Sequence, residues 1–110
     1  MPKYPMSDPM IDEVSGIFHA LSDASRLKIL RALLESKKPL NQGQVAEVTS
    51  LSQANASKHL SLLVRVGLVE RRQDGNTVYF SPISPLVPQV CDIMCGHVAA
   101  RIKSAYQSIT

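Results

Sequence analysis

Apolar residues recur every three or four positions along most of the 110-residue chain, a spacing that places them on one face of a helix. Three prolines before residue 10 predict a flexible arm over residues 1–9, followed by one folded domain over residues 10–110. The periodic segments predict five helices, over residues 10–21, from a cap at Ser22 or Asp23 to Lys37, and over residues 42–49, 51–67 and about 84–107.

The segment Leu51–Gly67, LSQANASKHLSLLVRVG, has two different faces. Ser52 is a suitable cap, because its hydroxyl can accept a hydrogen bond from a free amide of the first turn. One face is apolar: Ala56, Leu60, Leu63, Val64 and Gly67. The opposite face is short and polar with one cation: Gln53, Ala54, Ser57, Lys58 and Ser61. Short polar side chains suit close approach to the major groove of DNA. An ordinary surface helix is the alternative, although such helices more often carry Glu–Lys pairs.

A turn and a hairpin flank this segment. A turn of three or four residues joins it to the preceding helix, which is the spacing of a helix-turn-helix. Two β-prone runs (residues 68–72 and 77–81) then flank Asp74-Gly75-Asn76, which predicts a two-stranded hairpin, or wing. Arg71 and Arg72 precede its tip, where they can straddle backbone phosphates. The alternative is a solvated hairpin with charged residues along its edge.

The net charge of +3 is concentrated in the middle of the chain. Residues 23–80 contain nine Lys or Arg against five Asp or Glu, which favours a polyanionic partner for this segment. The sequence contains no export signal and no membrane span, and only two cysteines. We therefore expect a cytoplasmic protein with reduced thiols and no membrane partner.

The last predicted helix is apolar almost all round in its first half. Leu86, Val90, Met94, Val98 and Ile102 form one row, and Val87, Cys91 and Cys95 form the next. A domain of this size cannot bury such a helix alone. We expect a homodimer formed through the first and last helices. A twofold dimer would present two recognition helices to palindromic double-stranded DNA, with half-sites about 34 Å apart.

Three local motifs are specific enough to compare with known families. They are Asp23-Ala24-Ser25-Arg26-Leu27, then Leu51-Ser52-Gln53 followed by Ser57-Lys58-His59-Leu60, and Gly67-Leu68-Val69 with the Gly75 to Phe80 hairpin. Together they resemble the ArsR/SmtB family of bacterial winged-helix repressors, over roughly residues 14–100. The resemblance implies a dimer that binds an operator and leaves it when a metal ion, metalloid or oxidant alters the dimer. It also implies that Gln53, Ala54, Ser57 and Lys58 contact bases and adjacent phosphates. His59 is either a DNA contact or a packing residue.

The metal sites that the resemblance implies are incomplete in this chain. The first would fall on residues 40–46, LNQGQVA, which contain no cysteine or histidine. The second would fall on Ser84, Leu86, His97 and Ala100, of which only His97 can bind a metal ion. Because zinc and related ions need three or four protein ligands, a zinc, nickel or cobalt sensor of the common kind is not predicted.

Cys91 and Cys95 are the remaining effector candidates, because an i,i+4 pair projects both sulfurs from one helix face. Three interpretations stay open. Both thiols can be small core residues at the dimer contact. They can form a thiol switch that responds to oxidation or persulfidation. They can also bind a soft metal ion or metalloid with a sulfur from the partner, and no other cofactor is indicated.

The sequence lacks the signatures of common hydrolases, phosphate-binding loops and zinc proteases, so an enzyme is not predicted. The predicted fold is mainly α with a small β-hairpin: a winged helix-turn-helix of five helices and a two-stranded wing. The predicted function is a DNA-binding transcriptional repressor. The alternatives are a winged-helix module that binds other proteins and a repressor that ignores every effector.

Overall fold

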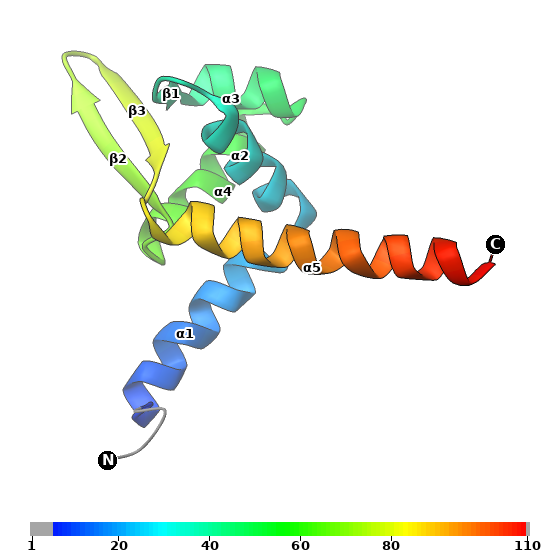
Figure 1. Cartoon of the computed structure of the whole chain (residues 1–110). Coiled ribbons are helices and arrows are strands. Elements are labelled where there is room, and N and C mark those ends of the chain that lie inside the picture. The colour runs from blue at the N-terminus through cyan, green and yellow to red at the C-terminus, as the bar shows by residue number, and fades with distance from the viewer. Residues whose placement is uncertain (1–5, 110) are drawn as a thin grey trace.

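The computed structural model describes residues 6–109 and contains all five predicted helices within them (Figure 1). Residues 1–5 of the predicted arm lie outside the described residues. The elements in chain order are α1 (Asp8–Leu21), α2 (Ala24–Glu35), β1 (Leu40–Asn41), α3 (Gln42–Thr49), α4 (Gln53–Arg65), β2 (Val69–Asp74), β3 (Thr77–Pro82) and α5 (Leu86–Ile109).

Short polar side chains define where the helices begin. Ser52 caps α4 as predicted, with its Oγ accepting from the Asn55 amide at 3.1 Å. Asp23, rather than Ser22, caps α2. Helix α1 begins two residues earlier than the apolar pattern indicated, because Ser7 accepts from the Met10 amide and so starts the helix ahead of its first apolar residue.

The turn between α3 and α4 closes with a left-handed residue. Ser50 has φ 59°, and the next amide, that of Leu51, donates to the Ala46 carbonyl at 3.0 Å. Gly67 ends α4 in the same way with φ 82°, while the Leu68 amide donates to the Leu63 carbonyl at 3.0 Å. These closures satisfy the last carbonyls of each helix and direct the chain into the next element.

The wing contains one strand more than predicted. The sheet is antiparallel with the order β1-β3-β2, so the predicted hairpin is present and β1 is added beside β3. Leu40 pairs with Phe80, and Asn41 pairs with Tyr79. A strand of two residues has no alternating pattern that sequence reading can detect. The added strand ties the start of α3 to the base of the wing.

The core lies where α2, α3 and α4 meet the base of the wing and the first turns of α5. Its largest fully buried side chains are Ile29, Leu30, Leu60, Leu63, Leu68, Val45, Val69 and Val87. Ala56, Leu60 and Leu63 confirm the apolar face predicted for α4, and Val64 packs against the core from its edge. Gly67, the fifth residue predicted for this face, lies beyond the end of α4 and is exposed. Helix α4 is therefore fixed by the four apolar residues within its bounds.

Helices α1 and α5 extend away from this core (Figure 1). Their outer residues include large apolar side chains in contact with solvent, such as Phe18, Ile93 and Met94, which are 65%, 70% and 55% exposed. Helix α5 is the longest element, yet no helix within the described residues has the continuous apolar length that crossing a bilayer requires. One protomer thus leaves two long apolar surfaces uncovered.

Candidate nucleic-acid interface

The polar face of α4 is accessible along the full length of the helix. Gln53, Ala54, Lys58 and Ser61 are exposed, and Ser57 is half-buried. The whole of α4 contains no acidic residue. The first turn of a helix carries a partial positive charge, which no carboxylate offsets within α4. This surface is therefore suited to an anionic partner.

Gln42, which sequence reading did not single out, lies against the start of this face. Its side-chain Nε2 donates to the backbone oxygen of Gln53 at 3.3 Å and to Oε1 of the Gln53 side chain at 3.2 Å. The two glutamines are the first residues of α3 and α4. Only the crossing of the two helices brings them together, so no local pattern predicts the contact.

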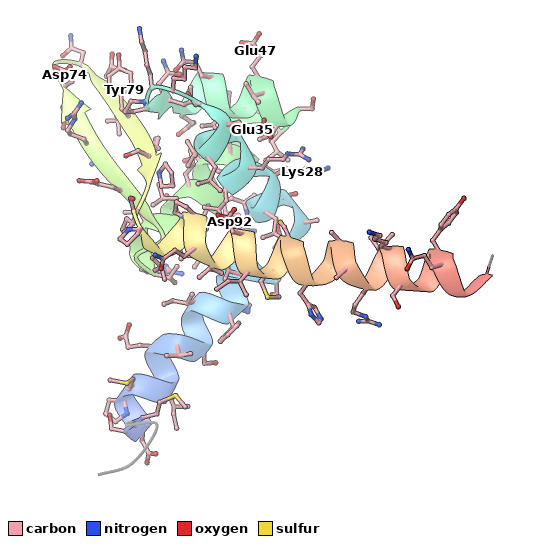
Figure 2. The ribbon with its side chains drawn as sticks, viewed as in Figure 1. Lys28, Glu35, Glu47, Asp74, Tyr79 and Asp92 are labelled. Atoms are coloured by element: carbon pink, nitrogen blue, oxygen red, sulfur yellow. The ribbon has the colours of Figure 1, made fainter. Side chains whose placement is uncertain are left out.

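Arg71 and Arg72 leave the wing on opposite faces. Arg71 is directly opposite Phe80, and Arg72 is opposite Tyr79, and successive residues of a strand point to opposite sides. Strand β2 is an edge strand, so the two exposed arginines flank its free edge. Asp74 lies at the tip (Figure 2), which puts a negative charge at the end of the wing and the positive charges nearer its base.

A buried arginine connects α1, α2 and α4. Arg26 is only 9% exposed, and its Nε donates to the Ala20 carbonyl at 2.7 Å while Nη2 donates to the His19 carbonyl at 3.2 Å. Nη1 lies 3.3 Å from Nδ1 of His59. A guanidinium only donates, so in a hydrogen bond between these atoms Nδ1 is the acceptor. This contact favours the packing interpretation of His59.

Asp23 supports the same junction from the start of α2. The backbone amide of Arg26 donates to its Oδ2 at 3.0 Å. This hydrogen bond, with a smaller contribution from the positive charge of Arg26, holds the pKa of Asp23 below its ordinary value of 3.8, against a weaker opposing effect of desolvation. The carboxylate is therefore the form that the folded protein prefers.

The lowered pKa of Asp23 predicts a loss of stability in acid. The folded state binds the Asp23 proton less tightly than the unfolded state does. The ionised carboxylate therefore adds to the free energy of unfolding fully above the ordinary pKa of 3.8, and this stabilisation is lost as the pH falls through the lower pKa of the folded state. We expect the urea midpoint of the natural protein to exceed that of Asp23→Asn at pH 7 and to approach it near pH 3. Asparagine still caps the helix but does not titrate. A difference that stays constant from pH 7 to 3 would contradict this assignment.

The two cysteines of α5 have different surroundings. Cys91 is half-buried against the core, and Cys95 is exposed. Burial raises the pKa of the Cys91 thiol, and the neighbouring Cys95 and Asp92 add to the effect. The surroundings of Cys91 therefore favour its thiol over the thiolate. Within the described residues of one protomer, no three His, Cys, Asp or Glu side chains are grouped so that they could hold a metal ion.

Comparison with known proteins agrees with this geometry. A family model described as a helix-turn-helix domain matches residues 21–72. CadC of Listeria innocua, a cadmium resistance transcriptional regulatory protein, is 40% identical over 67 residues, which cover 61% of this chain and 56% of CadC. The crystal structure of NolR from Sinorhizobium fredii is 31% identical with a TM-score of 0.70, over 86% of this chain and 92% of that one.

The homodimeric winged helix-turn-helix DNA-binding domain of Mb0332 from Mycobacterium bovis, described as a possible ArsR-family regulator, is 25% identical with a TM-score of 0.74. The match covers 92% of this chain and 90% of that domain. The chain belongs to the ArsR/SmtB family of helix-turn-helix regulators. This chain aligns with between 56% and 65% of the length of the first curated relatives that it matches.

The helix-turn-helix match covers only part of this ArsR/SmtB-family protein, residues 21–72. Residues 21–72 include Arg26, Gln42, the whole polar face of α4 and both wing arginines. They exclude all of α5 and therefore both cysteines. The match thus covers the candidate nucleic-acid interface and does not extend to α5.

Proposed function

We propose that the protein is a homodimeric transcriptional repressor that binds palindromic double-stranded DNA through α4 and the wing, and that an effector acting near α5 releases it. The observation that carries this proposal is the exposed face of α4, which is polar, free of acids and opposite an apolar face that packs against the core. A recognition helix needs this combination: a rigid inner face and an outer face that admits the backbone to the major groove.

The side chains of this face have distinct proposed roles. Gln53 and Ser57 contact base edges, because amides and hydroxyls pair with the donors and acceptors of the major groove. Ala54 permits close approach, and Lys58 and Ser61 bind phosphates. Arg71 and Arg72 bind phosphates on the two sides of the β2 edge. These roles divide the surface into positions that read sequence and positions that supply affinity.

The apolar surfaces of α1 and α5 support assembly with a second copy. Four large apolar side chains on one side of α5 are at least 48% exposed in the protomer: Met94, Val98, Ile102 and Tyr106. A monomer rarely leaves so large a contiguous apolar patch in water. A second copy related by a twofold axis would cover this patch and would align two α4 helices with two half-sites.

Substitutions on α4 test the proposed roles directly. Lys58→Ala is expected to weaken binding to every duplex and to reduce the slope of log affinity against log salt by about 1, because one phosphate contact is lost. Gln53→Ala is expected to cost on the order of 1–3 kcal/mol at one base pair and to relax preference there. Fluorescence anisotropy with duplexes selected from a random library measures both.

Lys103→Ala serves as the matched control, because it removes one exposed cation from α5 rather than α4. It is expected to leave both the base preference and the contacts of α4 unchanged. If Lys58→Ala and Gln53→Ala bind the selected duplexes as the natural protein does, the assignment of α4 as the DNA-reading helix is wrong.

For the effector, we propose Cys95 as the reactive thiol, with Cys91 in a packing role. Cys95 is exposed in the protomer, on the side of α5 that a second copy would contact, whereas Cys91 packs against the core and has a raised pKa. Since the thiolate is the reactive form, Cys95 should be alkylated several-fold faster than Cys91 at pH 7, as measured by mass spectrometry. Mild oxidation should release DNA from the natural protein and from Cys91→Ser, but not from Cys95→Ser.

Release that persists in Cys95→Ser would exclude the thiol switch. The soft-metal alternative, in which two Cys95 sulfurs of a dimer contribute ligands, predicts release by Cd²⁺ under reducing conditions instead. DNA binding that neither oxidation nor Cd²⁺ affects would assign both cysteines to packing and would leave a repressor with another effector or none.

A further inference from the structure

The contact between Gln42 and Gln53 constrains the side chain proposed to read a base. Nε2 of Gln42 donates at once to the backbone oxygen and to Oε1 of Gln53, at 3.3 and 3.2 Å. Gln42 is half-buried and is fixed at the start of α3 by a capping box between Asn41 and Gln44. The donor is therefore held on a rigid turn, while its acceptor is an exposed side chain.

The other end of the Gln53 amide lies over Gly43. A methyl group added at Gly43 would lie 3.5 Å from Nε2 of Gln53, which is ordinary contact distance. Among the described residues, none accepts a hydrogen bond from this Nε2. One end of the amide is thus held by a hydrogen bond, and the other keeps its two donors for a partner outside the chain.

A glutamine amide has an acceptor end and a donor end that differ in base preference. Oε1 accepts from adenine N6 or cytosine N4, and Nε2 donates to purine N7 or to the oxygens of guanine and thymine. A free side chain can rotate and present either end. Donation from Gln42 removes this freedom, because the rotated amide would place two N–H₂ groups against each other.

We infer that Gln42 is a positioning residue that sets the base preference of Gln53 by fixing the orientation of its amide. This inference rests on the proposed function of α4. In the natural protein, Nε2 of Gln53 donates into the groove, and the second lone pair of Oε1 stays available. The preferred base pair is therefore one that presents an acceptor, with adenine favoured because its N6 and N7 use both ends of the amide.

The experiment compares Gln42→Ala and Gln42→Glu with the natural protein on selected duplexes, with all four base pairs placed in turn at each half-site position. The position read by Gln53 is the one at which Gln53→Ala loses its preference. At that position Gln42→Ala is expected to reduce discrimination between base pairs about fivefold, the equivalent of one neutral hydrogen bond. The salt dependence and the urea midpoint are expected to stay close to those of the natural protein.

Gln42→Glu is expected to change which base pair is preferred at the position read by Gln53, rather than to weaken the discrimination. A carboxylate at residue 42 can only accept, so it would bind Nε2 of Gln53 and turn Oε1 toward the groove. Among the base pairs other than the one with adenine, preference should then shift from guanine, which presents only acceptors, toward cytosine, whose N4 is a donor. Gln89→Ala, an exposed glutamine on α5, is the matched control and should change nothing.

The double variant Gln42→Ala/Gln53→Ala separates positioning from direct contact. If Gln42 acts through Gln53, the double variant should match Gln53→Ala alone. An additional loss in the double variant would show that Gln42 contacts DNA itself and would overturn the inference, as would unchanged discrimination in Gln42→Ala. Failure of the natural protein to bind any duplex would instead overturn the proposed function, and this inference with it.

Discussion

Replacing Arg26 with alanine is expected to lower the free energy of unfolding by about 3 kcal/mol, one of the largest single effects in this chain. The guanidinium is 9% exposed and donates to the carbonyls of Ala20 and His19, two of the last carbonyls of α1. Alanine would leave these carbonyls without their charged donor and would open a cavity. His59 would lose its partner as well.

Urea denaturation monitored by circular dichroism measures this loss. Arg31→Ala is the matched control, because Arg31 is an exposed arginine of the same helix, and its loss should be within about 0.5 kcal/mol. Arg26→Lys should give an intermediate result, since an ammonium keeps the charge but cannot donate in three directions with the planar geometry of a guanidinium. A loss below about 1 kcal/mol for Arg26→Ala would show that the buried contacts do not hold the junction.

The double variant Val98→Asp/Ile102→Asp is expected to be monomeric and to bind a two-half-site duplex at least about 100-fold more weakly. These residues are one turn apart on the apolar side of α5 and are 48% and 65% exposed in the protomer. Burying four carboxylates in a twofold contact is strongly unfavourable. Loss of the dimer turns one bivalent binding event into two independent weak ones.

Analytical ultracentrifugation gives the assembly state, and fluorescence anisotropy gives the affinity. Ala100→Asp is the control, because it adds a carboxylate two residues from either position, on the opposite side of the helix. It should leave the dimer intact. Since all the substituted side chains are exposed in the protomer, the variants should still fold, with unchanged helical content. A dimeric double variant would place the contact between copies elsewhere.

The elements that follow from a local sequence pattern were predictable. The apolar face of α4 was evident because Ala56, Leu60 and Leu63 recur at helical spacing, and its cap was evident because Ser52 precedes a polar first turn. The hairpin followed from Asp74-Gly75 between β-prone runs. In each case neighbours in sequence determine the structure, so local patterns suffice.

The contacts that sequence reading missed all join distant residues. Arg26 meets His59 across 33 positions, and Gln42 meets Gln53 across 11. Strand β1 exists only because Leu40 and Asn41 meet the strand that contains Tyr79 and Phe80. Such pairs depend on how helices cross and how the wing closes, which no periodic pattern encodes. The sequence did not predict the unequal burial of Cys91 and Cys95, because it too depends on how α5 packs against the rest of the chain.

The central claim, that α4 and the wing bind DNA, is tested most directly by the salt dependence of binding. A duplex selected from a random library would be titrated with the reduced protein by fluorescence anisotropy between 50 and 300 mM salt, roughly the range over which such contacts weaken. We predict tight binding whose log affinity falls linearly with log salt, with a slope that Lys58→Ala and Arg71→Ala/Arg72→Ala each reduce. No enriched duplex, or an affinity that salt does not change, would contradict the claim and favour a winged helix that binds another protein.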